Sequence, residues 1–255
     1  MNTLAAEWRT SPGTVVSCVL VFIASTWVTI LWCGAACDMP GMGAWDRLPH
    51  QSRLDHFLAF EGMWIVMMVA MMMPVLAPAL MRFRQGLSGP APAIARHTLL
   101  FAGAYFAAWA LAGPILYAPG IAVAQVANHP AGSPWIPAAG STLILLAGCF
   151  QFSATKRRQI ECCRSVPISS AASPASARRS LLAGWRIGVR CVACCAGLTV
   201  TLLIAGVMDL LAMAAVTVGI VAERLLPRRA RMERGVGVIL VTLGVFLLAQ
   251  SLTQA

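Results

Sequence analysis

A methionine-rich apolar segment at residues 61–78 constrains the fold of this chain more than any other feature. Six methionines fall within eleven residues of it, and no charged residue follows Glu61 before residue 80. A helix needs about 20 predominantly apolar residues to cross a bilayer. The segment therefore predicts a transmembrane helix over residues 58–80.

The composition extends this prediction to the whole chain. Hydrophobic residues make up 59% of the 255 residues and charged residues 11%, whereas a soluble domain carries about 25% charge. We expect a single integral membrane domain over residues 1–255, with the lipid bilayer as its surroundings. The net charge of +10 does not indicate nucleic acid binding, because Lys and Arg cluster in a few loops.

Seven apolar segments predict an all-α, polytopic transmembrane helical bundle of about seven helices. They lie at residues 14–35, 58–80, 98–117, 135–152, 187–206, 209–225 and 235–251. The stretch at 187–226 would be about 60 Å long as one helix, twice the thickness of the hydrocarbon core. We therefore divide it at a tight turn near residues 206–209. A single broken helix there, giving six spans, is the alternative.

The positive charges predict how the bundle is oriented. With seven spans and a cytoplasmic N-terminus, the loops at 81–97, 153–186 and 227–234 all face the cytoplasm, and they hold most of the Lys and Arg residues. This is the distribution that the positive-inside rule requires. The loop at 153–186 is rich in Ser, Ala and Pro at its centre, so we expect it to be flexible.

The methionines of the 58–80 segment are candidate metal ligands. Met63, Met67 and Met71 repeat every four residues and share one helix face, and Met72 lies on a neighbouring face. Thioether sulfur is a soft ligand that suits Cu(I). The alternative is that these residues only pack, because methionine is an adaptable core residue.

A second candidate site is the sequence Cys191-Val-Ala-Cys194-Cys195. On a helix this spacing places Cys194 and Cys195 on the same side as Cys191, where thiolates can chelate a soft metal. Cys163 lies in the loop expected on the same side of the membrane, so we add it to the candidates. The alternatives are a redox-active pair or small residues that pack between membrane helices.

Asp209 is an acidic residue within a long apolar stretch, and Met208 precedes it. A carboxylate inside a membrane indicates a functional site, so both residues are candidate ligands. If residues 206–209 form the outer turn, Asp209 instead lies at the membrane interface with an ordinary role. We expect Glu223 and Arg224 to form an interfacial pair.

Three motifs together resemble a known family. They are Met63-Trp-Ile-Val-Met-Met-Val-Ala-Met-Met-Met-Pro74, then Phe150-Gln-Phe-Ser-Ala-Thr-Lys156 with Cys163-Arg164, and then Cys191 to Cys195 with Gly206-Val-Met-Asp209 and Glu223-Arg224. The chain is similar to the bacterial predicted metal-binding integral membrane proteins, whose domain is sometimes labelled copper chaperone. The resemblance implies a multi-pass protein of the bacterial inner membrane with a metal-related role.

The chain departs from the family pattern at several positions. Gln159 stands where the pattern has a cysteine, although the nearby Cys162 is an alternative to it. Ala196 stands where the pattern often has tryptophan, and Thr199 where it has methionine. Asp209 replaces an asparagine. A missing cysteine and a missing methionine weaken any site that would use them.

These observations predict a protein that binds Cu(I) and hands it over. An outer methionine site would accept the ion, and the inner thiols of Cys191, Cys194 and Cys195 would pass it to a copper-handling partner or membrane complex. Soft ligands at both ends suit ligand exchange, so we do not expect an enzyme. A membrane thiol-disulfide oxidoreductase using Cys191 and Cys194, and a non-catalytic assembly scaffold, are the alternatives.

Overall fold

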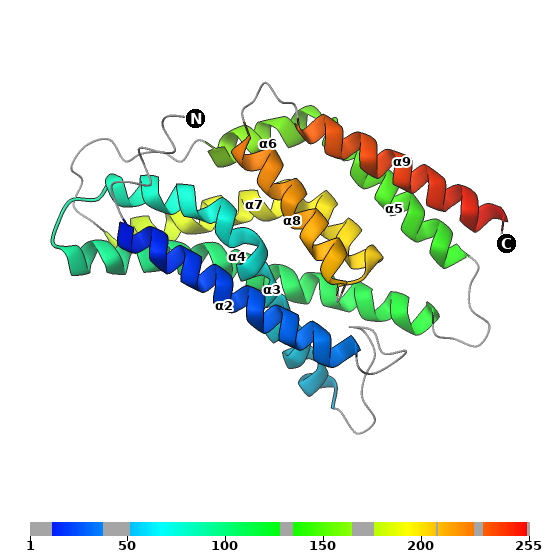
Figure 1. Cartoon of the computed structure of the whole chain (residues 1–255), viewed down its shortest axis with the longest axis horizontal. Helices are drawn as coiled ribbons and strands as arrows, with labels where there is room; N and C mark the ends of the chain where they lie inside the picture. The colour runs from blue at the N-terminus through cyan, green and yellow to red at the C-terminus, as the bar shows by residue number, and fades with distance from the viewer. Residues whose placement is uncertain are drawn as a thin grey trace.

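All the regular secondary structure in the described part of the chain is α-helix (Figure 1). A computed structural model describes residues 12–37, 52–127, 135–164, 176–207, 209–226 and 232–253. The helices within these ranges are α2 (Pro12–Cys37), α3 (Arg53–Gln85), α4 (Ala91–Ala127), α5 (Trp135–Gln151), α6 (Ala154–Arg164), α7 (Ala177–Ala205), α8 (Leu210–Leu225) and α9 (Met232–Thr253). The prediction of an all-α membrane bundle is confirmed.

Five of these helices, α2, α3, α4, α7 and α9, are long and apolar enough to cross a membrane. Helices α5 and α6 meet at a bend of 64° and count as a sixth span only if they are taken together. Helix α8 has 16 residues, fewer than the approximately 20 that a straight span requires. The described part of the chain thus has eight helices where about seven were expected, because α6 occupies part of the region predicted as a loop at 153–186.

The methionine-rich helix α3 forms the centre of the bundle. It begins after Ser52, whose hydroxyl accepts a hydrogen bond from the Asp55 amide at 3.1 Å, and it continues through two prolines to Gln85. It packs against α2, α4 and α8. The indole of Trp64 donates to the Trp109 carbonyl of α4 at 2.8 Å, which ties these two helices together inside the core.

Helices α4 and α7 approach each other closely because α7 carries glycine at two facing positions. A methyl group on Gly184 would collide with the backbone carbonyl of Phe101, and one on Gly188 would lie 2.7 Å from the carbonyl oxygen of Tyr105. Small residues four apart are a common means of bringing membrane helices together. This contact sets Tyr105 opposite the turn of α7 that carries Cys191.

The chain turns sharply between α7 and α8, as the sequence predicted for residues 206–209. Gly206 ends α7 with a φ of +124°, a conformation that other residues rarely adopt. Asp209 then precedes α8, which runs back along α7 and α3 (Figure 1). The apolar stretch at 187–226 is therefore two helices, and α7 begins at Ala177, ten residues before the predicted start.

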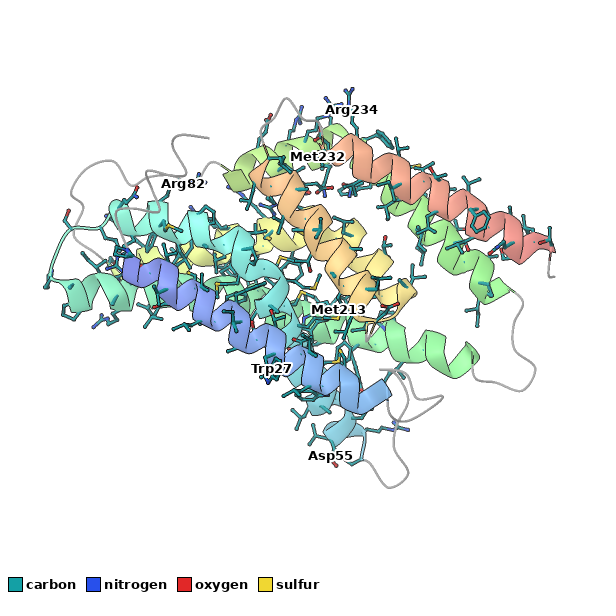
Figure 2. The ribbon with its side chains drawn as sticks, in the orientation of Figure 1. Trp27, Asp55, Arg82, Met213, Met232 and Arg234 are labelled. Atoms are coloured by element: carbon teal, nitrogen blue, oxygen red, sulfur yellow. The ribbon has the colours of Figure 1, made fainter. Side chains whose placement is uncertain are left out.

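Arginine-rich segments from distant parts of the sequence lie on one side of the molecule. Figure 2 shows Arg82 and Arg234 toward the upper side of the view and Asp55 at the opposite end, with Met213 between them. Helix α6 and the C-terminal end of α8 lie at the same side as these arginines, and the two helices are in contact (Figure 1).

Candidate metal site

Cys191 and Cys195 form a buried pair of thiols on one face of α7. Their Sγ atoms are 4.0 Å apart, and each residue is 1% exposed. A spacing of four residues brings two side chains to the same face of a helix. Cys194 is also buried, and its thiol interacts with that of Cys195.

Two polar side chains from other helices contact this thiol pair. The Tyr105 hydroxyl of α4 donates a hydrogen bond to Cys191 Sγ at 3.0 Å. A guanidinium nitrogen of Arg224, at the end of α8, lies 4.0 Å from Cys195 Sγ. A positive charge at that distance favours negative charge on the sulfur, as metal binding requires.

A buried ion pair lies beside the cysteine helix. Lys156 of α6 is 2.9 Å from a carboxylate oxygen of Glu223 in α8, and both side chains are almost fully buried. The same Lys156 ammonium donates to the backbone carbonyl of Cys194 at 2.6 Å. The sequence placed Glu223 and Arg224 at the membrane interface, but both side chains are buried: Glu223 is 3% exposed and pairs with Lys156, and Arg224 reaches Cys195.

Gln151, the last residue of α5, is a further buried polar group near this region. It is fully buried, and neither its amide oxygen nor its amide nitrogen has a hydrogen-bond partner within the described part of the chain. One turn earlier, Ala147 packs against Gly197 of α7. Because α5 and α7 run in opposite directions, this register places Gln151 near the level of Cys194.

A small cavity of about 30 Å³ lies between the methionine-rich helix α3 and Cys191. It is lined by residues of α3, α4, α7 and α8, among them Tyr105, Cys191 and Arg224. From α3 it is lined by residues beyond the methionine cluster, including Pro78 and Arg82. The two predicted sites thus belong to neighbouring parts of one core.

The predicted methionine ligands are all inside the bundle. Met63, Met67, Met71 and Met72 are each 3% exposed or less, and they belong to the same hydrophobic core as Cys191 and Cys195. Burial fits both metal binding and packing, so their role as ligands remains a prediction. The side chains of Cys163 and Met208 lie outside the described residues.

The structure brings together part of the predicted thiol site. Among the residues that the structure describes, no group of three or more His, Cys, Asp or Glu side chains has an arrangement suited to a metal ion. A metal site here would therefore use the sulfurs of Cys191 and Cys195. Either a further ligand of another kind would complete it, or the bound ion would be one that needs only two ligands.

Asp209 caps the helix that follows it. Its carboxylate accepts hydrogen bonds from the amides of Leu211 at 2.8 Å and Ala212 at 3.1 Å, and the residue is exposed at the start of α8. These bonds satisfy two amides at the end of the helix that lack partners within it. This geometry accounts for an acidic residue at this position without a metal.

We expect Asp209→Ala to lower the free energy of unfolding by about 1 kcal/mol, because alanine cannot cap α8. Asp209→Asn is the matched control, since asparagine caps as well as aspartate but carries no charge. Thermal unfolding in detergent measures the first effect, and copper content after loading with Cu(I) measures any ligand role. Loss of copper in both variants would show that Asp209 is a ligand as well as a cap.

Besides Arg224, three residues at this site were not among the predicted ligands. Tyr105, Lys156 and Gln151 lie far from the cysteines in sequence, and their contacts depend on how α4, α5 and α6 pack on α7. Gln151 and Lys156 do lie within the second of the motifs that resemble the copper chaperone family. That motif was the feature of the sequence that could have identified them as site residues.

Comparison with protein families decides the membership of this chain. Residues 61–247, well over half of the chain, match the family PpoB2, described as a copper chaperone. The chain belongs to the PpoB2 family. The matched range of this family contains most of α3, the buried ion pair and the thiol pair, and excludes α2. Neither a curated protein nor a solved structure matches the chain.

Proposed function

We propose that this membrane protein of the PpoB2 family binds Cu(I) and hands it to a partner by ligand exchange. The observation that carries the proposal is the buried pair of Cys191 and Cys195 with their sulfurs 4.0 Å apart. With thiolate bonds of about 2.3 Å, the length found at zinc, one ion can bridge sulfurs up to about 4.6 Å apart. Soft thiolates favour Cu(I).

The charges around the pair fit a monovalent ion. Two thiolates and one Cu(I) ion carry a net charge of −1, and the guanidinium of Arg224 beside Cys195 supplies +1. Opposite unit charges 4 Å apart attract by about 4 kcal/mol at an effective dielectric constant of 20. Lys156 and Glu223 balance each other. A loaded site would therefore be close to neutral within the bundle.

The methionines of α3 would supply the ion to this pair. Met63, Met67, Met71 and Met72 form a series of thioethers along the central helix, and the later turns of α3 line the cavity beside Cys191. Thioethers bind Cu(I) without having to lose a proton, so they can pass the ion on to the stronger thiolate ligands. Exchange between ligands of this kind needs no catalytic group, so we propose a carrier and not an enzyme.

The proposed setting is the bacterial inner membrane, with the arginine-bearing side of the bundle in the cytoplasm. The positive-inside rule and the placement of Arg82 and Arg234 on one side support this orientation. The thiol pair would then lie toward the cytoplasmic side, and a copper-handling protein there would be the acceptor.

We expect the purified wild-type protein, loaded with Cu(I) under reducing conditions, to retain close to one copper per chain. The variant Cys191→Ser/Cys195→Ser should retain almost none, because serine oxygens are poor ligands for a soft ion. Cys149→Ser is the matched control, since Cys149 is an exposed thiol on α5. Mass spectrometry of the metal content gives the readout.

Equal copper in the wild type and the double variant would refute the thiol site. If the protein holds no copper but Cys191 and Cys195 interconvert between thiol and disulfide, the result would instead support a thiol-disulfide oxidoreductase. The 4.0 Å contact favours Cys191 and Cys195 for that chemistry, beside the predicted pair of Cys191 and Cys194. If neither property is found, an assembly scaffold is the remaining alternative.

A further inference from the structure

Cys195 interacts with two other thiols of α7. Its Sγ atom is 4.0 Å from that of Cys191, and its thiol also interacts with that of Cys194. Each of the three residues is 1% exposed or less. The three sulfurs therefore form two pairs that share Cys195. Because no three His, Cys, Asp or Glu side chains in the described helices are arranged around one ion, an ion here would contact one pair at a time.

The pair of Cys191 and Cys195 faces the methionine side of the bundle. Both residues belong to the hydrophobic core that contains the methionines of α3, whereas Cys194 is buried outside that core. The Tyr105 hydroxyl of α4 contacts Cys191 Sγ at 3.0 Å. Copper supplied along α3 would therefore reach Cys191 and Cys195 first.

Cys194 lies toward α5 and α6. Gly197, three residues later and on the same side of α7, packs against Ala147 of α5, and Lys156 of α6 binds the Cys194 carbonyl. At the level of Cys194, the fully buried amide of Gln151 has no hydrogen-bond partner within the described part of the chain. An unpaired buried amide is costly, and a negatively charged sulfur on this side of α7 would give its N–H group an acceptor.

We infer that copper crosses α7 by ligand exchange at the shared thiol, moving from the pair of Cys191 and Cys195 to the pair of Cys195 and Cys194. The inference rests on the proposed function and names the path of the ion within that site. A bond from copper to Cys194 Sγ forms and the bond to Cys191 Sγ breaks, while the bond to Cys195 Sγ is kept. The proton of the Cys194 thiol moves to the Cys191 sulfur. Copper stays Cu(I), and no electrons are transferred.

This exchange keeps the charge of the buried site constant. The ion and the proton move in opposite directions, so two thiolates, one thiol and one Cu(I) ion are present before and after the step. A change of net charge inside a weakly polar bundle would be costly. The guanidinium of Arg224 lies 4.0 Å from the sulfur of Cys195, the ligand common to both positions, so this contact accompanies the ion in each of them.

Single serine variants loaded with Cu(I) under reducing conditions distinguish two overlapping pairs from one isolated pair. Cys191→Ser leaves Cys194 and Cys195, so it should retain about as much copper as the wild type. Cys195→Ser removes the shared sulfur and should retain less than about one fifth of that amount. Cys149→Ser is the control, since Cys149 is an exposed thiol on α5.

Thermal unfolding in detergent shows whether each variant is folded, and Cys191→Ala replaces Cys191→Ser if the serine variant is not. If Cys191→Ser loses copper as fully as Cys195→Ser, the isolated pair is the whole site and the inference is refuted. Retention of copper by Cys195→Ser would also refute it, because the shared thiol would not be needed. If the wild type itself retains no copper, the proposed function fails and the inference fails with it.

The rate of copper release tests the order of the two positions. Cys194→Ser can hold the ion only at the first pair, so it should retain copper but release it to bathocuproine disulfonate, a water-soluble Cu(I) chelator, at least about tenfold more slowly than the wild type. Cys191→Ser keeps the second pair and should release copper at close to the wild-type rate. Equal release from Cys194→Ser and the wild type would refute passage through Cys194 while copper binding by the protein stands.

Discussion

Replacing Lys156 with methionine is expected to lower the free energy of unfolding by about 3–5 kcal/mol, the range found when one partner of a buried ion pair is removed. The substitution leaves the carboxylate of Glu223 without its 2.9 Å partner and the Cys194 carbonyl without its 2.6 Å donor. Methionine has a similar length and fills the same space, so lost packing contributes little. Unfolding by heat or denaturant in detergent measures the change.

A double variant shows whether the cost comes from an unpaired charge. Lys156→Met/Glu223→Leu removes both charges, and replacing a buried ion pair with apolar residues is often nearly neutral. The double variant should therefore be more stable than Lys156→Met alone. If it is less stable than the single variant, Glu223 contributes through interactions other than the pairing with Lys156, and the explanation by unpaired charge is wrong.

Gly184→Ala is the second substitution for which we expect a large effect, a loss of about 3 kcal/mol of stability from overpacking. The added methyl group would meet the carbonyl oxygen, carbonyl carbon and Cα of Phe101, which are backbone atoms and cannot rotate away. Helices α4 and α7 would have to separate. Thermal unfolding in detergent reports the loss of stability.

The matched control lies on the partner helix. Gly103 of α4 has no atom within 4 Å of an added methyl group, so Gly103→Ala should be neutral or stabilising by up to about 1 kcal/mol through helix propensity. Separation of α4 from α7 would also remove the hydrogen bond from Tyr105 to Cys191, which should make Cys191 easier to alkylate in Gly184→Ala. Equal stability of the two alanine variants would contradict the close approach.

The methionine-rich helix shows what hydropathy identifies and what it omits. The apolar segment predicted a span over residues 58–80, and α3 extends from Arg53 to Gln85. The prediction covered only the part of α3 that is apolar enough for the hydrocarbon core, because it was based on the apolar residues alone. The additional turns at both ends carry His56, Arg82 and Arg84, polar residues that a helix accommodates once it leaves the hydrocarbon.

Helix α6 could not be recognised from apolar patterning. It has 11 residues, and its charged residues read as part of a positively charged loop. Its buried side chains include Lys156 and Ile160, so an ion pair, a hydrogen bond to the Cys194 carbonyl and an apolar side chain all help to hold it against the bundle. A lysine near the end of an apolar segment normally indicates the cytoplasmic side of the membrane. The neighbouring sequence does not distinguish such a lysine from one that is buried.

For the candidate site, sequence spacing predicted neighbours within a helix and could not predict neighbours between helices. The four-residue spacing of Cys191 and Cys195 indicated a shared face, and the structure confirms that their sulfurs are in contact. The contacts of Tyr105 and Arg224 with those sulfurs depend on the packing of α4 and α8, to which sequence distance is no guide. Asp209 shows the converse, since an acidic residue in an apolar stretch proved to be a helix cap.

The position of Lys156 along the chain has a consequence for how the protein is made. A ribosome synthesises Lys156 before either of its partners, with the Cys194 carbonyl following 38 residues later and Glu223 later still. Until α8 has been inserted, the ammonium of Lys156 has no buried carboxylate to meet, although α6 can already contact α7. The contacts of Glu223 and Arg224 around the cysteines of α7 are therefore among the last to form during biogenesis. A nascent chain that stops before α8 would not form them.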